Sequence, residues 1–244
     1  MKKIRITPFS IPWFGFIAYC VISLILMRLF VYPLPLEQRL RFQLILGIAG
    51  YVYLRIYKFA LSTVKGYDYN YFNELPCYLC NLTAIIGIIG TVLNSRIIGV
   101  YCFSIGLAGA LLAFMKPDPD FRDMELISIR ALGFYGYHSL LVIFCLGFTV
   151  LGLCEPQPSD VFGVVGITLV LTLIGHLTNF TVRKLHLCDN ANYIFTYDPG
   201  DNGILLFFYK LIPVRMLYLL PVALPVGGIY LIIYCIYRLF ALVF

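Results

Sequence analysis

Seven apolar stretches close to the length of a membrane crossing dominate this sequence of 244 residues. A helix that spans about 30 Å of hydrocarbon needs about 20 predominantly apolar residues. Only 12% of the residues are charged, whereas soluble domains have about a quarter. The sequence therefore predicts an all-α, polytopic transmembrane helical bundle that forms one integral membrane domain over residues 1–244. The predicted spans are Phe9–Tyr32, Phe42–Tyr57, Leu75–Leu93, Ile97–Phe114, Leu126–Leu153, Val161–Phe180 and Met216–Leu239.

Two of these spans carry residues that shape helix packing. The fourth has a run of small residues from Ser104 to Ala110, which predicts a close approach to a neighbouring helix. The seventh contains Pro221 and Pro225, and proline in a helix interior removes a backbone hydrogen bond. The seventh span is therefore expected to be kinked.

Lys and Arg residues are distributed unequally between the two sides of the predicted membrane, thirteen against five. By the positive-inside rule the amino terminus is cytoplasmic and the carboxyl terminus is outside. The basic residues flank apolar runs and do not cluster with aromatics, so no nucleic-acid partner is expected. The cytoplasmic set is Lys2, Lys3, Arg5, Arg55, Lys58, Lys65, Lys116, Arg122, Arg130, Arg183, Lys184, Lys210 and Arg215, and the outer set is Arg28, Arg39, Arg41, Arg96 and Arg238.

Two thiols and an amide side chain lie at the start of the third predicted span, in the stretch Leu75-Pro76-Cys77-Tyr78-Leu79-Cys80-Asn81. Proline is tolerated in the first turn of a helix, where its missing N–H would be unpaired. With Pro76 at that position, Cys77, Cys80 and Asn81 are expected on one helix face. The charge distribution places this face near the cytoplasm.

The other cysteines lie mostly within apolar runs, where a structural disulfide framework is unusual. A lone thiol in such a run usually fills space as a small hydrophobic group. The eight cysteines are Cys20, Cys77, Cys80, Cys102, Cys145, Cys154, Cys188 and Cys235.

His138 is the plainest titratable residue inside a span. Such residues are costly in a membrane, so each is a functional candidate. The alternative is a packing histidine bonded to a backbone carbonyl; the thiol pair on the same side favours the functional interpretation. His176 is a weaker candidate that could pack with Asn179, and His186 is expected to be solvated or interfacial.

A thiol beside an imidazole is a nucleophile with its base, because the imidazole takes the proton or stabilises the thiolate. The predicted catalytic residues are thus Cys77, Cys80 and His138. Asn192, in the loop between the sixth and seventh spans, could donate to a substrate carbonyl oxygen. No metal or cofactor is expected, since the acidic stretch from Lys116 to Glu125 reads as a solvated Asp-Pro turn.

The order and spacing of four motifs resemble the YwaF family of bacterial integral membrane proteins and its eukaryotic relatives, the transmembrane-protein-164 phospholipid acyltransferases. The motifs are Leu75-Pro76-Cys77-Tyr78-Leu79-Cys80, then Gly106-Leu107-Ala108-Gly109-Ala110-Leu111-Leu112 leading to Pro117, then Tyr137-His138, then Asn192-Tyr193-Ile194-Phe195.

This resemblance implies a multi-pass membrane protein that transfers a fatty acyl chain between phospholipid and lysophospholipid, and that is located in the cell membrane if its source is bacterial. It further implies a cysteine that carries the acyl group as a thioester and His138 as the base. The eukaryotic relatives have the cysteine directly after the proline, which matches Cys77, whereas bacterial members tend to have it at the position of Cys80. The next residue is usually His or Gln in the family and is Tyr78 here, which can donate a hydrogen bond but is no base. Tyr78, Asn81 and Asn192 form the predicted substrate-binding and oxyanion set.

Two other functions remain open at this point. The Pro76-Cys77-Tyr78-Leu79-Cys80 stretch also resembles the motif of quinone-linked thiol oxidoreductases of the DsbB type, although its cytoplasmic position and the lack of a second exterior pair count against this. Alternatively, His138 and the broken seventh span could line the cavity of a transporter or lipid-binding protein without chemistry.

Overall fold

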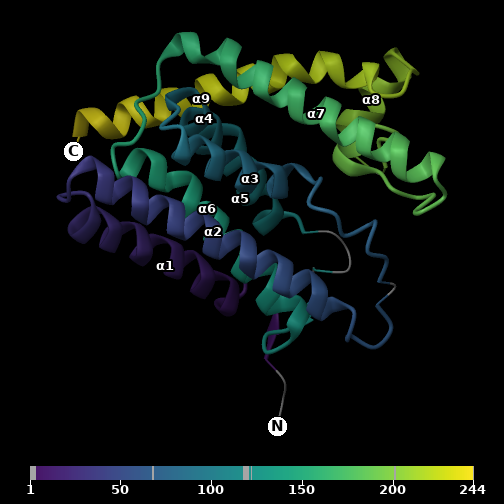
Figure 1. Ribbon diagram of the computed structural model, residues 1–244, viewed down its shortest axis with the longest axis horizontal. Coiled ribbons are helices and arrows are strands. Elements are labelled where there is room, and N and C mark those ends of the chain that lie inside the picture. Colours follow the sequence, from purple (N-terminus) through teal and green to yellow (C-terminus); the bar gives the residue numbers. More distant parts are fainter. Residues whose placement is uncertain (1–3, 68, 118–120, 122, 201, 244) are drawn as a thin grey trace. The chain divides into compact units, whose positions relative to one another are not determined.

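The computed structural model describes residues 4–67, 69–117, 121, 123–200 and 202–243. Within these residues six helices are long and apolar enough to cross a membrane, which confirms a polytopic helical bundle (Figure 1). They correspond to six of the seven predicted spans. The remaining predicted span, the third in chain order, corresponds to Leu79–Val92, an apolar helix of only 14 residues. The six are Ile11–Val31, Leu36–Leu61, Arg96–Met115, Ile129–Val150, Pro158–Lys184 and Leu217–Leu239.

Helix boundaries differ most from the prediction where charged residues extend a helix beyond its apolar part. The second span was expected over Phe42–Tyr57, but the helix runs over 26 residues, Leu36–Leu61. Hydropathy does not register such polar ends, which helices tolerate well. Lys2, Lys3 and Arg122 of the charge distribution, and Asp118 and Asp120 of the acidic stretch, lie outside the described residues.

The chain forms two compact units. The first comprises residues 1–69 and 83–155, and the second comprises residues 70–82 and 156–244. The boundary falls within α3 (Leu79–Val92), so the first residues of this helix belong to the second unit. A single integral membrane domain over residues 1–244 remains a prediction.

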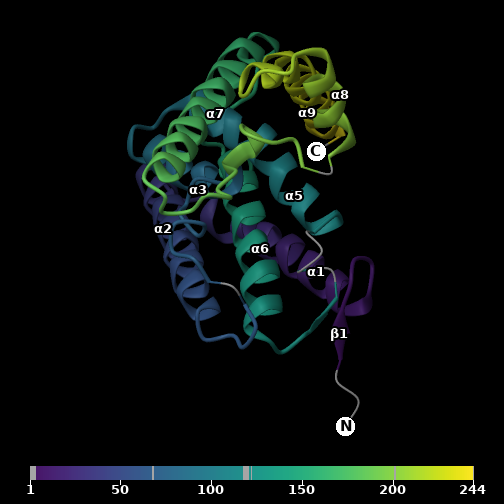
Figure 2. The ribbon, with the colours of Figure 1, turned by 90° about the vertical axis from the view of Figure 1, so that its right-hand side faces the viewer.

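Helix α6 is the central element of the first unit and packs against α1, α2 and α5 (Figure 2). Most of its side chains are buried, from Ala131 to Phe148. Its neighbours approach closely, because a Cβ added at Gly133 would lie 1.8 Å from the ring of Tyr57. In chain order the elements of this unit are β1 (Arg5–Ile6), α1 (Ile11–Leu26), π-helical η1 (Met27–Val31), α2 (Leu36–Leu61), most of α3, α4 (Arg96–Tyr101), π-helical η2 (Cys102–Gly106), α5 (Leu107–Met115), β2 (Met124–Glu125) and α6 (Ile129–Val150).

The small residues of the fourth span permit the close helix contact that was predicted. A Cβ at Gly106 would lie 2.5 Å from the Thr83 methyl group of α3. Ser104 is buried beside it and donates its hydroxyl hydrogen to the Val100 carbonyl at 2.7 Å. This span is thus one helical run in which a π-helical turn joins α4 to α5.

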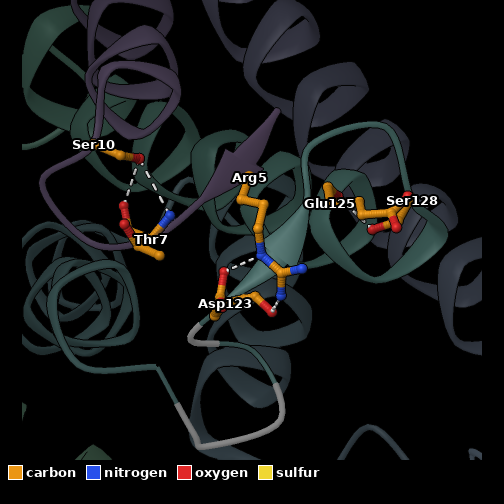
Figure 3. Close-up of polar contacts among 6 residues, drawn as sticks. All are labelled: Arg5, Thr7, Ser10, Asp123, Glu125 and Ser128. Carbon is orange, nitrogen blue, oxygen red and sulfur yellow. Dashed lines mark hydrogen bonds and ion pairs between the residues drawn. The ribbon is translucent and has the colours of Figure 1, made fainter. Parts of the chain in front are cut away.

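A short antiparallel strand pair ties the amino-terminal segment to the start of α6 (Figure 3). Arg5 pairs with Glu125 in the ladder, and its guanidinium donates from Nε to Asp123 at 2.6 Å. The Asp123 carboxylate raises the pKa of Arg5. Ser128 accepts from the Ala131 N–H at 3.1 Å and so caps the amino end of α6.

The second unit is built on α7 and α9, which pack against each other. The predicted break in the seventh span is present, since Pro221 lies in a 3₁₀ turn and the α-helix begins only at Ala223. Asn202 caps α8 by accepting from the Ile204 and Leu205 N–H groups. The elements are the coil and first α3 residues of 70–82, 3₁₀-helical η4 (Pro158–Asp160), α7 (Val161–Lys184), 3₁₀-helical η5 (Tyr193–Phe195), α8 (Gly203–Leu211), 3₁₀-helical η6 (Leu217–Val222) and α9 (Ala223–Val243).

Candidate active site

The thiol motif begins before its helix. Helix α3 starts at Leu79, so Pro76 is not in its first turn and Cys77 precedes it in a turn whose Cys77 N–H donates to the Leu75 carbonyl at 2.8 Å. The prediction that Cys77 shares a helix face with Cys80 and Asn81 is therefore wrong. Since Cys77 stands just before α3, the positive end of the helix dipole favours negative charge there.

The Cys77 thiol is half-buried against α7. Its Sγ lies 3.7 Å from the Thr178 hydroxyl, which in turn donates to the Ile174 carbonyl at 2.9 Å. Cys77 also packs on the buried cluster of Val182, Cys188, Ala191 and Tyr193. Thr178 belongs to no motif, and no local pattern predicts its contact with a thiol 101 residues earlier in the chain.

Cys80 and Asn81 lie in the first turn of α3 itself. Cys80 is half-buried and Asn81 is buried, and the Asn81 N–H donates to the Tyr78 carbonyl at 2.9 Å. The Tyr78 ring meets Tyr193 edge-on, with ring centroids 5.0 Å apart. Both Cys77 and Cys80 are free thiols. The motif and the loop after α7 thus form one structural region of the second unit.

Asn179 fixes that loop onto α7. Its amide donates to the Tyr193 carbonyl at 2.9 Å and to the Thr196 hydroxyl at 2.8 Å, and its oxygen accepts from the Tyr193 N–H at 2.8 Å. The predicted packing of Asn179 with His176 is replaced by these bonds, and His176 instead lies against the ring of Tyr197. Burial raises the pKa of the Tyr193 hydroxyl, which therefore stays protonated and donates to the Phe72 carbonyl.

Asn192 serves the loop around it. Its Nδ2 donates to the Asp198 carbonyl at 2.8 Å, and its Oδ1 accepts from the Tyr197 and Asp198 N–H groups. A donor role toward a substrate uses the second N–H of the amide, which has no partner among the described residues. That role remains a prediction.

His138 is buried in α6 of the first unit, with 9% of its surface exposed. Because α6 begins at Ile129, three residues later than expected, His138 lies about 14 Å along the helix at about 1.5 Å per residue. Its Nδ1 is 2.8 Å from the Phe134 carbonyl oxygen, and the rings of Phe134, Tyr137 and Phe114 surround it. The carbonyl can only accept, so Nδ1 carries the proton and Nε2 of the neutral ring keeps its lone pair. His186, in contrast, is exposed and pairs with Asp189 at 3.2 Å.

Six long apolar helices among the described residues define a multi-pass integral membrane protein. A family model described as the TMEM164 family matches residues 6–238, and the chain belongs to this family. The match confirms the resemblance to the TMEM164 relatives that the four motifs predicted. No curated protein and no solved structure matched the chain. Among the described residues no group of three or more His, Cys, Asp or Glu side chains could hold a metal ion.

Proposed function

We propose that this protein transfers a fatty acyl chain between membrane phospholipids through an acyl-cysteine intermediate, with Cys77 as nucleophile and His138 as general base. The observation that carries the proposal is the bond between His138 Nδ1 and the Phe134 carbonyl. It fixes the ring orientation and reserves Nε2 as the proton acceptor that a thiol needs. Membership of the TMEM164 family supports a membrane protein like the other members of that family.

In the first half-reaction His138 Nε2 takes the proton of the Cys77 thiol, and the thiolate attacks the carbonyl carbon of a phospholipid acyl ester. The tetrahedral intermediate breaks its bond to the glycerol oxygen, which receives the proton from His138. The products are a lysophospholipid and an acyl thioester on Cys77. No oxidant, reductant or metal takes part in the balance of this step.

In the second half-reaction His138 Nε2 takes the proton from the hydroxyl of an acceptor lysophospholipid. The oxygen attacks the thioester, the C–S bond breaks, and the thiolate recovers its proton. The surroundings of His138 are aromatic, and exclusion of water protects a thioester from hydrolysis. Transfer is therefore favoured over release of free fatty acid.

Three features distinguish Cys77 from Cys80 as the nucleophile. Cys77 precedes α3, whose first N–H groups favour a thiolate at that point. The Thr178 hydroxyl oxygen lies 3.7 Å from its sulfur and accepts from the thiol, which orients the sulfur. Its position directly after Pro76 matches the eukaryotic relatives. We assign Cys80 and Asn81 to the wall of the site, and Tyr78 and Asn192 to substrate contacts.

The test is to give the purified full-length protein a phospholipid with a radiolabelled acyl chain and to measure hydroxylamine-sensitive label on the protein. We expect label on the unmodified protein, on Cys80→Ala and on the control Cys235→Ala, whose thiol is exposed in α9. Cys77→Ala should carry none. Label retained in the Cys77→Ala/Cys80→Ala double variant would overturn the proposal.

The same variants separate the other two functions. A thiol oxidoreductase forms a Cys77–Cys80 disulfide that quinone regenerates, and loses function on removal of either thiol. A transporter or lipid-binding protein without chemistry keeps full function after removal of His138 and both thiols. Either result would replace the transferase.

A further inference from the structure

Two arginines of the second unit hold the ring of one tyrosine. The guanidinium carbon of Arg183 lies 4.6 Å from the Tyr197 ring centroid, and that of Arg215 lies 4.7 Å from it. Arg183 is in the last turn of α7, and Arg215 lies two residues before the final span, Leu217–Leu239. Cation–π contacts of this kind orient a guanidinium without using its hydrogen-bond donors.

Most of the hydrogen-bond donors of these two guanidinium groups have no partner among the described residues. Arg183 uses its Nε–H for the Ala191 carbonyl at 2.6 Å, which fixes the guanidinium, while its two NH₂ groups have no partner among the described residues. The guanidinium of Arg215, which is exposed, has no hydrogen-bond partner among the described residues. The Tyr197 hydroxyl likewise has none there. The two guanidinium groups and the Tyr197 hydroxyl therefore offer hydrogen-bond donors that the described residues do not use.

The charges of this arginine pair are not neutralised within the described residues. The ion pair of this unit, between His186 and Asp189, involves neither arginine, and the Asp198 carboxylate accepts from the Gly200 N–H at 2.7 Å. His176, whose ring lies 5.3 Å from that of Tyr197, has a buried Nδ1 for which the described residues offer no hydrogen-bond partner. Two cations in contact with one tyrosine ring, and an imidazole beside that ring, favour an anionic ligand.

The two arginines lie at the ends of membrane spans, at the level where the phosphates of lipid headgroups are found. Arg183 ends one span and Arg215 precedes the next, so both stand at the same membrane surface. Between them, α8 has no buried residue, and its Ile204, Phe207 and Leu211 are 67%, 63% and 66% exposed. These three residues share one helix face, as in helices that lie in the membrane interface.

We propose that Arg183 and Arg215, positioned by Tyr197, bind the phosphate diester of a phospholipid headgroup. The identity of that lipid as a substrate rests on the proposed acyl transfer. The Ala191 carbonyl that fixes Arg183 belongs to the same buried cluster on which Cys77 packs. A bound headgroup is thus held in the structural region that carries the thiol, and the site selects lipids that contain phosphate over neutral glycerolipids.

The test measures ligand binding by native mass spectrometry on the full-length Cys77→Ala protein in detergent, so that acyl transfer plays no part. The probes are lysophosphatidylcholine, a monoacylglycerol with the same acyl chain and no phosphate, and glycerol 3-phosphate as a soluble phosphate. We expect lysophosphatidylcholine to bind at least about tenfold more tightly than either of the others, as a charge-assisted contact implies.

Arg215→Gln is the key variant, because this side chain is exposed and the fold does not depend on its hydrogen bonds. It should remove about tenfold of affinity for lysophosphatidylcholine and leave monoacylglycerol binding unchanged. Arg183→Gln should do the same. Lys184→Gln and Lys210→Gln, which remove an equal charge from the same surface, should stay within about twofold.

Equal binding by Arg215→Gln and Lys210→Gln would overturn the assignment. Binding of glycerol 3-phosphate as tight as that of the lysophospholipid would overturn the lipid as ligand in favour of a soluble phosphate ester. Because these measurements use a chain without the Cys77 thiol, they stand even if the hydroxylamine test shows no acyl-cysteine.

Discussion

Asn179 binds Tyr193 at both its N–H and its carbonyl, from a fully buried position on α7. One side chain thereby supplies the partner of the Tyr193 N–H and a second donor to its carbonyl, which also accepts from the Thr196 N–H. Through Tyr193 it also determines the surface on which Cys77 and Tyr78 pack.

Asn179→Ala should destabilise the protein by about 1–3 kcal/mol, because it leaves the buried Tyr193 N–H without a partner. Thermal unfolding in detergent measures the loss. Leu177→Ala is the control, since Leu177 is an exposed residue of the same helix. Unfolding of Asn179→Ala at the same temperature as this control would show that the loop has other supports.

His138→Gln should slow formation of the acyl-enzyme about a hundredfold or more, the usual contribution of a general base. Glutamine can still donate to the Phe134 carbonyl, but it offers no basic nitrogen. Single-turnover labelling with the radiolabelled phospholipid gives the rate. His186→Gln, at an exposed loop position, should be unchanged; a His138→Gln rate within threefold of it would remove His138 from the mechanism.

Thr178→Val should lower the same rate by about tenfold or more, because the Cys77 thiol loses the hydroxyl oxygen that orients it while side-chain shape is kept. Thr181 is the matched control. Its hydroxyl donates to the Leu177 carbonyl at 2.9 Å, as that of Thr178 donates to Ile174. Equal rates in Thr178→Val and Thr181→Val would argue that the hydroxyl only fills space.

Gly133→Ala should prevent the packing of α2 on α6, since the new methyl group would lie 1.8 Å from a Tyr57 ring carbon. Overpacking of a core costs about 1–3 kcal/mol or more. Gly15→Ala on α1 has no atom within 4 Å of its new Cβ and should be neutral or stabilising. Yield of monodisperse protein and the unfolding temperature of both variants check this, and a stable Gly133→Ala would mean that Tyr57 moves aside without cost.

Much of the fold could be predicted because a membrane imposes its own length on a helix. Hydropathy located six long helices, and the positions of Gly106 and Pro221 predicted a close contact and a break that the structure contains. His138 was placed correctly inside a span, and its bond to Phe134 follows the four-residue period of a helix.

Local sequence patterns could not predict where α3 starts or which residues contact the thiols near its start. Pro76 suits a first helical turn by itself, yet the preceding coil is held by a long-range bond from Tyr193 to the Phe72 carbonyl. The contacts of Cys77 with Thr178, and of Arg183 and Arg215 with Tyr197, likewise join segments that no periodicity relates. Such tertiary contacts override a local propensity of a few tenths of a kcal/mol.

The shortness of α3 has a consequence for the surrounding lipid. Its 14 residues rise about 21 Å at 1.5 Å each, which is less than the roughly 30 Å of a hydrocarbon core. Either the bilayer thins around this helix or the coil before it completes the crossing. In the second case peptide groups near Cys77 sit where water is scarce, and the bonds at Leu75 and Phe72 replace hydration. A lipid substrate would then reach the Cys77 thiol laterally, from within one leaflet of the bilayer.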